Sequence, residues 1–106
     1  MTIPRLTHLQ FLVVSLLMKG AAPGRDIRTS LKREHVRQSG PAFYQMMAGL
    51  EDHGVVEGWY EQQIVDAQII RERHYKVLAE GKKSWKECRD FYARVLGARG
   101  ALAHGA

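Results

Sequence analysis

The sequence predicts a mainly α-helical domain with one small β-hairpin, in the order helix, helix, helix, strand, strand, helix. Its length of 106 residues suits a single domain. Capping residues precede apolar side chains spaced three and four apart, near the start of the chain and again around residue 40, which is typical of amphipathic helices. Residues 55–77 are instead rich in β-branched and aromatic side chains, which favour strands.

The composition excludes several classes of protein. Hydrophobic residues make up 45% of the chain and charged residues 25%, so we expect a folded globular domain rather than a disordered one. One cysteine provides neither a disulfide framework nor a cysteine-based zinc site, and the five histidines lack metal-ligand spacing, so we expect no metal and no cofactor. The longest apolar stretch, Phe11–Met18, is too short to span a bilayer, and no signal peptide is evident. A cytoplasmic location without membrane attachment is expected.

The first helix is predicted from Leu9 to Lys19. Thr7 and Gln10 form the capping-box pattern T-x-x-Q before its apolar run, and Gly20 ends it. Its apolar side chains surround nearly the whole helix, which indicates burial on more than one side. In so short a chain we expect the second cover to come from another subunit.

Two further helices are predicted to follow at short intervals. Residues 21–24 form a turn, and the second helix covers Arg25–Arg33 with an inward pair spaced four apart. Ser39 caps the third helix, Pro41 lies in its first turn and Gly54 closes it. The inward stripe of the third helix consists of Phe43, Met47 and Leu50.

A hairpin and a last helix complete the pattern. Residues 55–60 and 69–77 fit two strands, and Glu61–Gln68 forms the arm and tip of the hairpin between them. The tip contains neither Gly nor Pro, so its turn type is not readable from the sequence. The last helix is predicted over residues 79–96, with apolar side chains at spacings of three and four that suit helix–helix packing. This seam consists of Trp85, Cys88, Tyr92 and Val95.

The order of these elements is that of a winged helix-turn-helix domain. The second and third helices would form the DNA-reading unit and the hairpin the wing. We divide the chain into this domain over residues 1–78, a dimerisation helix over 79–97 and a flexible tail over 98–106. The formal net charge is +5, and all of the excess lies in residues 1–50, where seven Lys and Arg face two acids. A concentrated basic segment indicates phosphate binding, with a solvated helix face as the alternative.

Four motifs between Leu9 and Tyr92 carry a family resemblance. They are L-L-M-K-G at residues 16–20, S-G-P-A-F-Y at 39–44, G-L-E-D-H-G-V-V-E at 49–57 and E-R-H-Y-K-V-L-A-E-G at 72–81. Together they resemble the PadR family of bacterial winged-helix transcriptional regulators. The third and fourth motifs, at this spacing, are the most specific.

The resemblance implies a DNA-binding transcriptional regulator, namely a repressor that binds a palindromic operator in double-stranded DNA as a homodimer. It also implies a small aromatic effector, for which Trp59, Trp85 and Tyr92 are candidates, with packing as their alternative role. The sequence departs from the family pattern at Leu78, where Thr is usual, and at Ala48 and Gly49, where Lys or Arg is common. It departs again at the wing tip, which reads Q-Q-I-V-D-A-Q instead of a run rich in Gly, Pro and Arg.

The candidate DNA-binding residues follow from the fold class. A helix-turn-helix places the start of its third helix in the major groove, where Gln45 can pair with adenine and Ser39 and Tyr44 can bond a phosphate. The basic side chains are predicted backbone contacts, although Arg73 is equally suited to pair with Glu57 or Glu61. The full set is Arg28, Lys32, Arg33, Arg37, Ser39, Ala42, Tyr44, Gln45, Arg73 and Lys76.

The dimer is expected to form between the first and last helices. Its candidate contacts are Leu12, Leu16, Trp85, Cys88, Tyr92 and Val95, with a buried structural thiol as the alternative role of the cysteine. We expect no enzyme, because no catalytic constellation or phosphate-cradling glycine loop is present in the sequence. The alternative function is a winged-helix protein–protein interaction module without sequence-specific DNA binding. The few cations on the third helix and the apolar wing tip favour that alternative.

Overall fold

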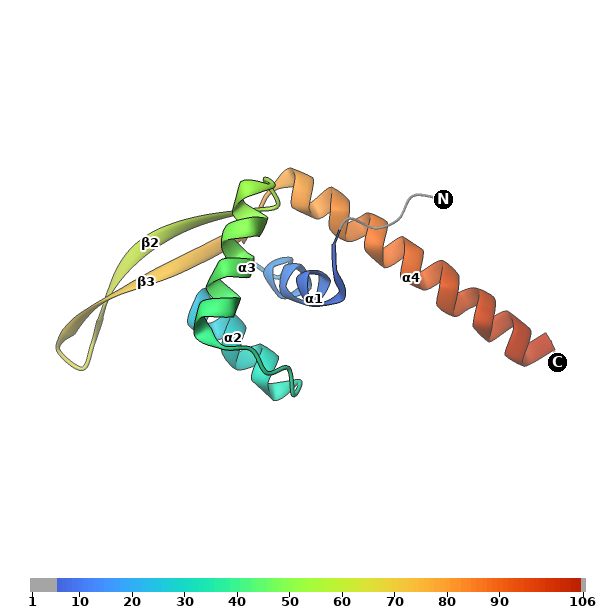
Figure 1. Cartoon of the computed structure of the whole chain (residues 1–106), viewed down its shortest axis with the longest axis horizontal. Helices are drawn as coiled ribbons and strands as arrows, with labels where there is room; N and C mark the ends of the chain where they lie inside the picture. Colours follow the sequence, from blue (N-terminus) through green and yellow to red (C-terminus); the bar gives the residue numbers. More distant parts are fainter. Residues whose placement is uncertain (1–5, 106) are drawn as a thin grey trace.

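The computed structural model describes residues 6–105, and their side chains as far as residue 97. Four helices and a three-stranded antiparallel sheet of order β1-β3-β2 make up the fold (Figure 1). The predicted winged helix-turn-helix, mainly α with a small β-hairpin, is confirmed. The elements are α1 (His8–Leu17), β1 (Ala22–Pro23), α2 (Gly24–Arg33), α3 (Gly40–Asp52), β2 (Val56–Val65), β3 (Gln68–Val77) and α4 (Ala79–Gly105).

The capping signals read from the sequence are made in the structure. The Thr7 hydroxyl accepts from the Gln10 backbone N–H at 3.2 Å, and the Gln10 side-chain oxygen accepts from the Thr7 N–H at 3.0 Å. The Ser39 hydroxyl accepts from the Ala42 N–H at 3.2 Å and so caps α3. Each bond satisfies a donor that the first helical turn leaves free, which fixes where these helices begin.

The predicted turn at residues 21–24 is wrong, because part of it forms a strand. Ala22 pairs with Tyr75 and Pro23 with His74, so β1 lies beside β3 and makes it the central strand of the sheet. Pro23 is tolerated there because β1 is an edge strand, and the outer edge of such a strand has no neighbouring strand to which a backbone N–H must donate. A strand of two residues carries no periodicity, and its partner lies far along the chain, so the sequence offered no signal for it.

The hairpin strands are longer than predicted. The segment Glu61–Gln68 was expected to include a loop, but β2 continues to Val65 and β3 begins at Gln68. Only Asp66 and Ala67 form the turn, with φ of 51° and 63°. Positive φ at both central residues is the geometry of a type I′ turn, whose twist matches that of the strands it joins. Ala rarely adopts this conformation, which explains why the turn could not be recognised.

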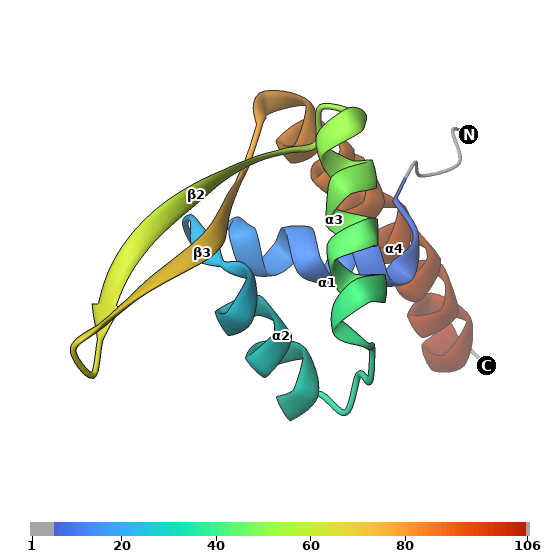
Figure 2. The same ribbon diagram turned by 60° about the vertical axis from the view of Figure 1, so that its left-hand side comes forward.

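The hydrophobic core lies among α1, α2, α3 and the base of the hairpin. α1 occupies the middle of the domain, with the hairpin base, α2 and α4 around it (Figure 2). The fully buried large side chains include members of every one of these elements, and they are Val13, Val14, Leu17, Ile27, Phe43, Met47, Val56, Tyr75 and Cys88. The inward stripe predicted for the third helix is confirmed by the burial of Phe43, Met47 and Leu50.

The second cover of α1 comes from α4 of the same chain, which corrects the expectation of another subunit there. The Trp85 indole N–H donates to the Ser15 hydroxyl at 2.8 Å, and the Phe11 ring packs against Trp85 and Tyr92 with centroids 6.2 and 5.5 Å apart. Cys88 is fully buried beside them. Three of the four residues of the seam expected to face a partner, Trp85, Cys88 and Tyr92, therefore pack within this chain, whereas Val95 is exposed.

α4 is longer than predicted and reaches well beyond the body of the domain. It was expected to end at Leu96, ahead of a flexible tail, but it is helical as far as Gly105. The wing and α4 project in opposite directions, which gives the molecule its extents of 62 × 27 × 22 Å (Figure 1). Over the described residues, no helix combines the length and the apolar character needed to cross a membrane.

Candidate nucleic-acid interface

The outward face of α3 is the centre of the candidate interface. Ala42, Tyr44, Gln45 and Ala48 are exposed on it, and Ser39 is exposed at its start. The Tyr44 ring packs edge-on against the buried Phe43, with centroids 5.0 Å apart, and its hydroxyl lies beside Gly24, where an added Cβ would be 3.0 Å from it. The face thus presents one amide, one phenol and small side chains that allow close approach.

Arg28 brings a positive charge to the beginning of α3. A Cβ on Gly40, the first residue of the helix, would lie 3.4 Å from its Nη1 atom, so the guanidinium covers the first turn. Within the described part of the chain, no carboxylate forms an ion pair with Arg28. The N-terminus of a helix also attracts anions. Both groups therefore favour a negative ligand, such as a phosphate, at this end of α3.

A hollow of about 520 Å³ lies beside the same end of α3. Lys32, His35 and Arg37 line it together with Gln38 and Ser39. The Gln38 side-chain oxygen is buried and has no hydrogen-bond partner among the described residues. The two cations are exposed, so their charges are available to a ligand in the hollow. This places two of the predicted phosphate contacts next to the predicted N-cap.

A larger groove of about 780 Å³ separates α3 from the wing. Four arginines, three tyrosines and two carboxylates line it, and they are Arg25, Arg28, Arg71, Arg73, Tyr44, Tyr60, Tyr75, Glu51 and Glu72. The four arginines outnumber the two carboxylates, which leaves the groove positive. Arg25, Arg71 and Tyr60 were not among the predicted site residues. Arg71 reaches the groove because the strand register brings alternate β3 residues 71, 73 and 75 to one face beside α3.

Arg73 pairs with Glu51 of α3, and not with Glu57 or Glu61 across the hairpin. Its Nη2 donates to both carboxylate oxygens of Glu51 at 2.9 Å, and each side chain is only about a quarter exposed. Partial burial would lower the pKa of the Arg73 guanidinium, but the hydrogen bond and charge of Glu51 outweigh it and raise that pKa. We call this ion pair the α3–wing clasp, because it joins the end of α3 to β3.

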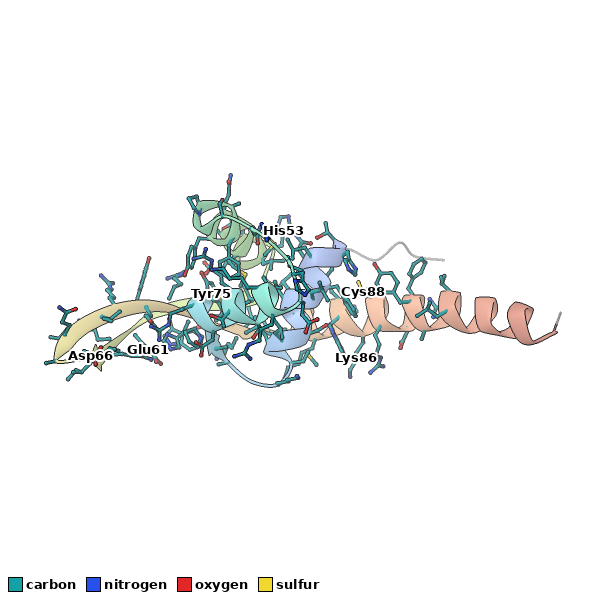
Figure 3. All side chains as sticks on the ribbon, turned by 90° about the horizontal axis from the view of Figure 1, so that it is seen from below. His53, Glu61, Asp66, Tyr75, Lys86 and Cys88 are labelled. Carbon is teal, nitrogen blue, oxygen red and sulfur yellow. The ribbon has the colours of Figure 1, made fainter. Side chains whose placement is uncertain are left out.

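Gly58 makes room for the clasp. It lies on β2 opposite Tyr75, and a Cβ at this position would collide with Oε1 of Glu51 and approach Nη2 of Arg73 within 2.9 Å. Tyr75, which Figure 3 labels, is buried, and the Arg73 guanidinium lies 6.0 Å from its ring centroid. Burial, together with the negative charge of Glu51, raises the pKa of the Tyr75 phenol to about 12, so it is neutral at ordinary pH. The clasp therefore lies beside a neutral aromatic side chain.

Arg71 is the wing cation best placed for a ligand. Its guanidinium lies over the Tyr60 ring, 4.4 Å from the ring centroid, and Arg73 lies over the same ring at 4.7 Å. Arg71 is exposed, and among the described residues it forms no ion pair. Lys76 is on the opposite face of β3 and forms an exposed ion pair with Glu57 at 3.3 Å, so it points away from the groove.

Arg33 and the two leucines predicted for the dimer lie elsewhere. A hollow of about 590 Å³ between α1 and α2 is lined by Leu12, Leu16 and Val36, with Arg33 at the same site. This places Arg33 outside both basic hollows beside α3. On α4, Val95 is 39% exposed and Leu96 is 67% exposed. Cys88, by contrast, is fully buried.

The tryptophans have packing roles in the structure. Trp85 packs against Phe11 and binds Ser15, and Arg89 lies 5.2 Å from its ring centroid. Trp59 stacks on His74 and donates to Glu61 at 3.0 Å. In the part of the chain that the structure describes, no group of three His, Cys, Asp or Glu side chains is placed to hold a metal ion.

Solved structures of bacterial regulators share this fold. The chain aligns with a PadR family transcription regulator from Clostridium difficile at a TM-score of 0.76 and 15% identity, over 92% of this chain and 99% of that one. A PadR-like transcriptional regulator from Bacillus cereus gives a TM-score of 0.73 at 14% identity, over 92% and 93% of the two chains. PadR of Bacillus subtilis in complex with operator DNA gives 0.62 at 21% identity, over 76% of this chain and 46% of that chain.

These likenesses establish the fold as the winged helix-turn-helix of PadR-like regulators. No protein-family model matches the sequence, and no curated protein matches it. The shared fold is thus recognised from the structure and from the short motifs described above.

Proposed function

We propose that this protein is a DNA-binding transcription regulator that places α3 in the major groove of duplex DNA. The observation that carries the proposal is the position of four cations that form no ion pair with any residue the structure describes. Arg28, Lys32 and Arg37 surround the beginning of α3, and Arg71 lines the groove on its other side. A helix bordered on both sides by phosphate-binding groups is what a major-groove reader requires.

The proposed contacts divide into positioning and reading. The cations and the Ser39 N-cap bind phosphates, which fixes the register of α3 on the duplex without reading sequence. Gln45 is the exposed amide in the first two turns of α3, and its side chain can make two hydrogen bonds to an adenine edge. Tyr44 donates to a phosphate. Operator DNA bound to PadR of Bacillus subtilis, whose fold this chain shares in part, supports the same class of partner.

The protein is further proposed to bind a palindromic operator as a homodimer and to act as a repressor. The hollow between α1 and α2 and the exposed apolar end of α4 are two surfaces that one copy can offer another. Two α3 helices related by a two-fold axis then enter successive major grooves about one helical turn apart. Occupying the operator would exclude other proteins from the same DNA.

The salt dependence of binding to random duplex DNA tests the proposal. Fluorescence anisotropy should show a steep loss of affinity between about 50 and 200 mM salt, the range over which proteins that contact several phosphates lose affinity. Selection of bound sequences from a random pool should then return a palindrome. A flat salt response and an unenriched pool would contradict it. Lys86→Ala, on the exposed face of α4, is the matched control and should leave the slope unchanged.

One observation favours a second function, a protein–protein interaction module. The exposed face of α3 carries no Lys or Arg among residues 40–49. A module of this kind would show the flat salt response, and its affinity for a protein partner would depend on Tyr44 and not on Arg28 or Lys32.

A further inference from the structure

The groove between α3 and the wing has an excess of two positive charges. Two of its four arginines pair with the two carboxylates that line it, at 3.2 and 2.9 Å. The other two, Arg28 and Arg71, form no ion pair with any residue that the structure describes. A phosphate monoester carries about −1.5 to −2 charges at pH 7 and so matches this excess better than a single carboxylate does.

The size and the rings of the groove suit a flat organic ligand. Its volume of about 780 Å³ lies within the roughly 300–1,000 Å³ that small-molecule sites occupy. Two guanidinium groups already lie over the Tyr60 ring, whereas the Tyr44 ring is 39% exposed at the same groove. Heteroaromatic bases stack on tyrosine rings and on guanidinium planes. A ligand that joins a base to a phosphate therefore finds partners for both of its parts.

Glu72 adds an acceptor without a donor. Its Oε1 atom pairs with Nη1 of Arg25 at 3.2 Å, whereas its Oε2 atom is buried and has no hydrogen-bond partner among the described residues. A buried acceptor without a donor carries a cost in free energy, which a ligand N–H at this position would remove. The Arg25 side chain is 58% exposed, and ion pairs this open contribute little stability, so a ligand can displace it from the carboxylate at small cost.

The base that such a carboxylate selects is guanine. An ionised carboxylate accepts hydrogen bonds through two oxygens side by side and donates none. Guanine presents two adjacent donors, N1–H and N2–H, on one edge. Adenine, cytosine and uracil each place an acceptor beside the donor on that edge, and this acceptor would face a carboxylate oxygen.

We propose that the groove is a binding site for a free guanine nucleotide that carries a terminal phosphate monoester. Arg28 and Arg71 bind the phosphate, and Tyr44 stacks on the base. Glu72 accepts from N1–H and N2–H of guanine. Since the two arginines are also proposed phosphate contacts for DNA, the bound nucleotide competes with DNA. Nucleotide binding is independent of the proposed function, and only this competition rests on it.

Isothermal titration calorimetry of the whole chain with guanosine 5′-monophosphate tests the site. This nucleotide should bind about tenfold more tightly than adenosine 5′-monophosphate, because the adenine edge leaves an acceptor of Glu72 without a donor. Guanosine and inorganic phosphate each lack one half of the ligand and should bind more weakly than the guanine nucleotide by a similar factor. Equal affinity for both nucleotides and inorganic phosphate would show adventitious anion binding only and overturn the proposal.

Two variants separate the two halves of the site. Arg71→Ala should weaken the binding of both nucleotides about tenfold, because a charge-assisted bond to the phosphate is lost. Glu72→Gln should bring the two nucleotides to equal affinity, because an amide offers one acceptor in place of two. The matched controls are Lys76→Ala and Glu57→Gln, which open an exposed ion pair on the opposite face of the hairpin and should change neither affinity.

Circular dichroism and thermal melting show whether each variant folds like the parent. Arg71 is exposed, so its variant keeps the test decisive if Glu72→Gln unfolds. An unchanged affinity in Arg71→Ala, or a guanine preference that survives in folded Glu72→Gln, would overturn the proposal.

The last measurements distinguish the source of the nucleotide and its effect on DNA. A guanine-containing single strand that binds while the free nucleotide does not would make the groove a strand-binding site and overturn the proposal. In fluorescence anisotropy with random duplex DNA, guanosine 5′-monophosphate should release the DNA and guanosine should not, and DNA that stays bound at saturating nucleotide would overturn the competition. If the nucleotide binds and DNA does not, the proposed function fails and the site stands. If DNA binds and the nucleotide does not, the site fails and the proposed function stands.

Discussion

Gly58 shows how a single residue sets the position of the wing. The absence of a side chain there lets Glu51 cross β2 and reach Arg73. Gly58→Ala would force the carboxylate away and open the clasp. Because the pair is only about a quarter exposed, we expect a loss of about 1 kcal/mol in the free energy of unfolding. Urea denaturation measures it.

The control for this prediction is Gly49→Ala. Gly49 lies inside α3 with no atom within 4 Å of an added Cβ, so the same substitution should stabilise by roughly 0.5–1 kcal/mol. In a Glu51→Ala background, which removes both the ion pair and the colliding atoms, Gly58→Ala should cost less than it does alone. Equal costs in the two backgrounds would show that the clasp is not what the alanine disturbs.

Tyr75 predicts a loss of stability at high pH. Its phenol has a pKa of about 12 in the folded protein against 10 for the free side chain. Between these values the unfolded chain releases the proton first, so the free energy of unfolding falls as pH rises from 10 to 12, by roughly 2 kcal/mol. Tyr75→Phe should flatten the profile in this window. A parent protein with no decline there would contradict the prediction.

Variants of Gln45 and Tyr44 distinguish proposed contacts that read bases from proposed contacts that bind phosphates. Gln45→Ala should relax the preference at one base pair per half-site, because a bidentate pair to adenine is worth about 1–3 kcal/mol of discrimination. Tyr44→Phe removes one hydroxyl and should cost about 0.5–1.5 kcal/mol on every sequence alike. Binding to the selected operator and to its single-base variants measures both. If neither variant differs from the parent, α3 is not the reading element.

At the scale of the elements, variants of Arg33 and Arg37 test which part of the basic surface contacts DNA. Arg37 lies beside the N-cap of α3, whereas Arg33 lines the hollow between α1 and α2. Arg37→Ala should reduce the slope of log affinity against log salt by about 0.9, and Arg33→Ala should leave it unchanged. A reduction by both variants would place the DNA path across α1 as well.

The sequence predicted the elements whose signals are local. Caps and apolar spacing within α1 and α3 depend on residues three or four apart, so Thr7, Ser39 and the stripe ending at Leu50 were identified correctly. Strand β1 was missed, because it exists only through its pairing with β3. The partner of Arg73 was missed for the same reason, since the approach of α3 to the hairpin is set by tertiary packing.

The candidate site was predictable to a similar extent. The charge pattern identified the basic segment around α2, and Lys32 and Arg37 indeed lie beside α3. Arg71 was not predicted as a contact residue, because only the strand register places its side chain over Tyr60 in the groove. Helix α4 was underestimated in length, since three glycines in the last ten residues favoured a coil.

At the scale of the whole molecule, the dimer is the property to test. Light scattering at micromolar concentration should give about twice 12.0 kDa, as expected for a two-fold symmetric assembly. Val95→Lys with Leu96→Lys places charges on the exposed apolar end of α4 and should shift the protein toward the monomer. Glu87→Lys changes the net charge by the same amount at an exposed site closer to the start of α4 and should not. A parent protein that is monomeric at this concentration would contradict the proposal.

The clasp between Glu51 and Arg73 constrains the position of the wing relative to α3. It holds the wing close to α3, so that, if both contact DNA as proposed, the base pairs that they meet would be separated by a set number of steps. One base pair inserted between the two proposed contacts would rotate one of them about the DNA axis by about 35° relative to the other. Sites that carry the preferred bases at a different spacing would then bind more weakly. The Glu51–Arg73 ion pair would in this way contribute to the choice of operator.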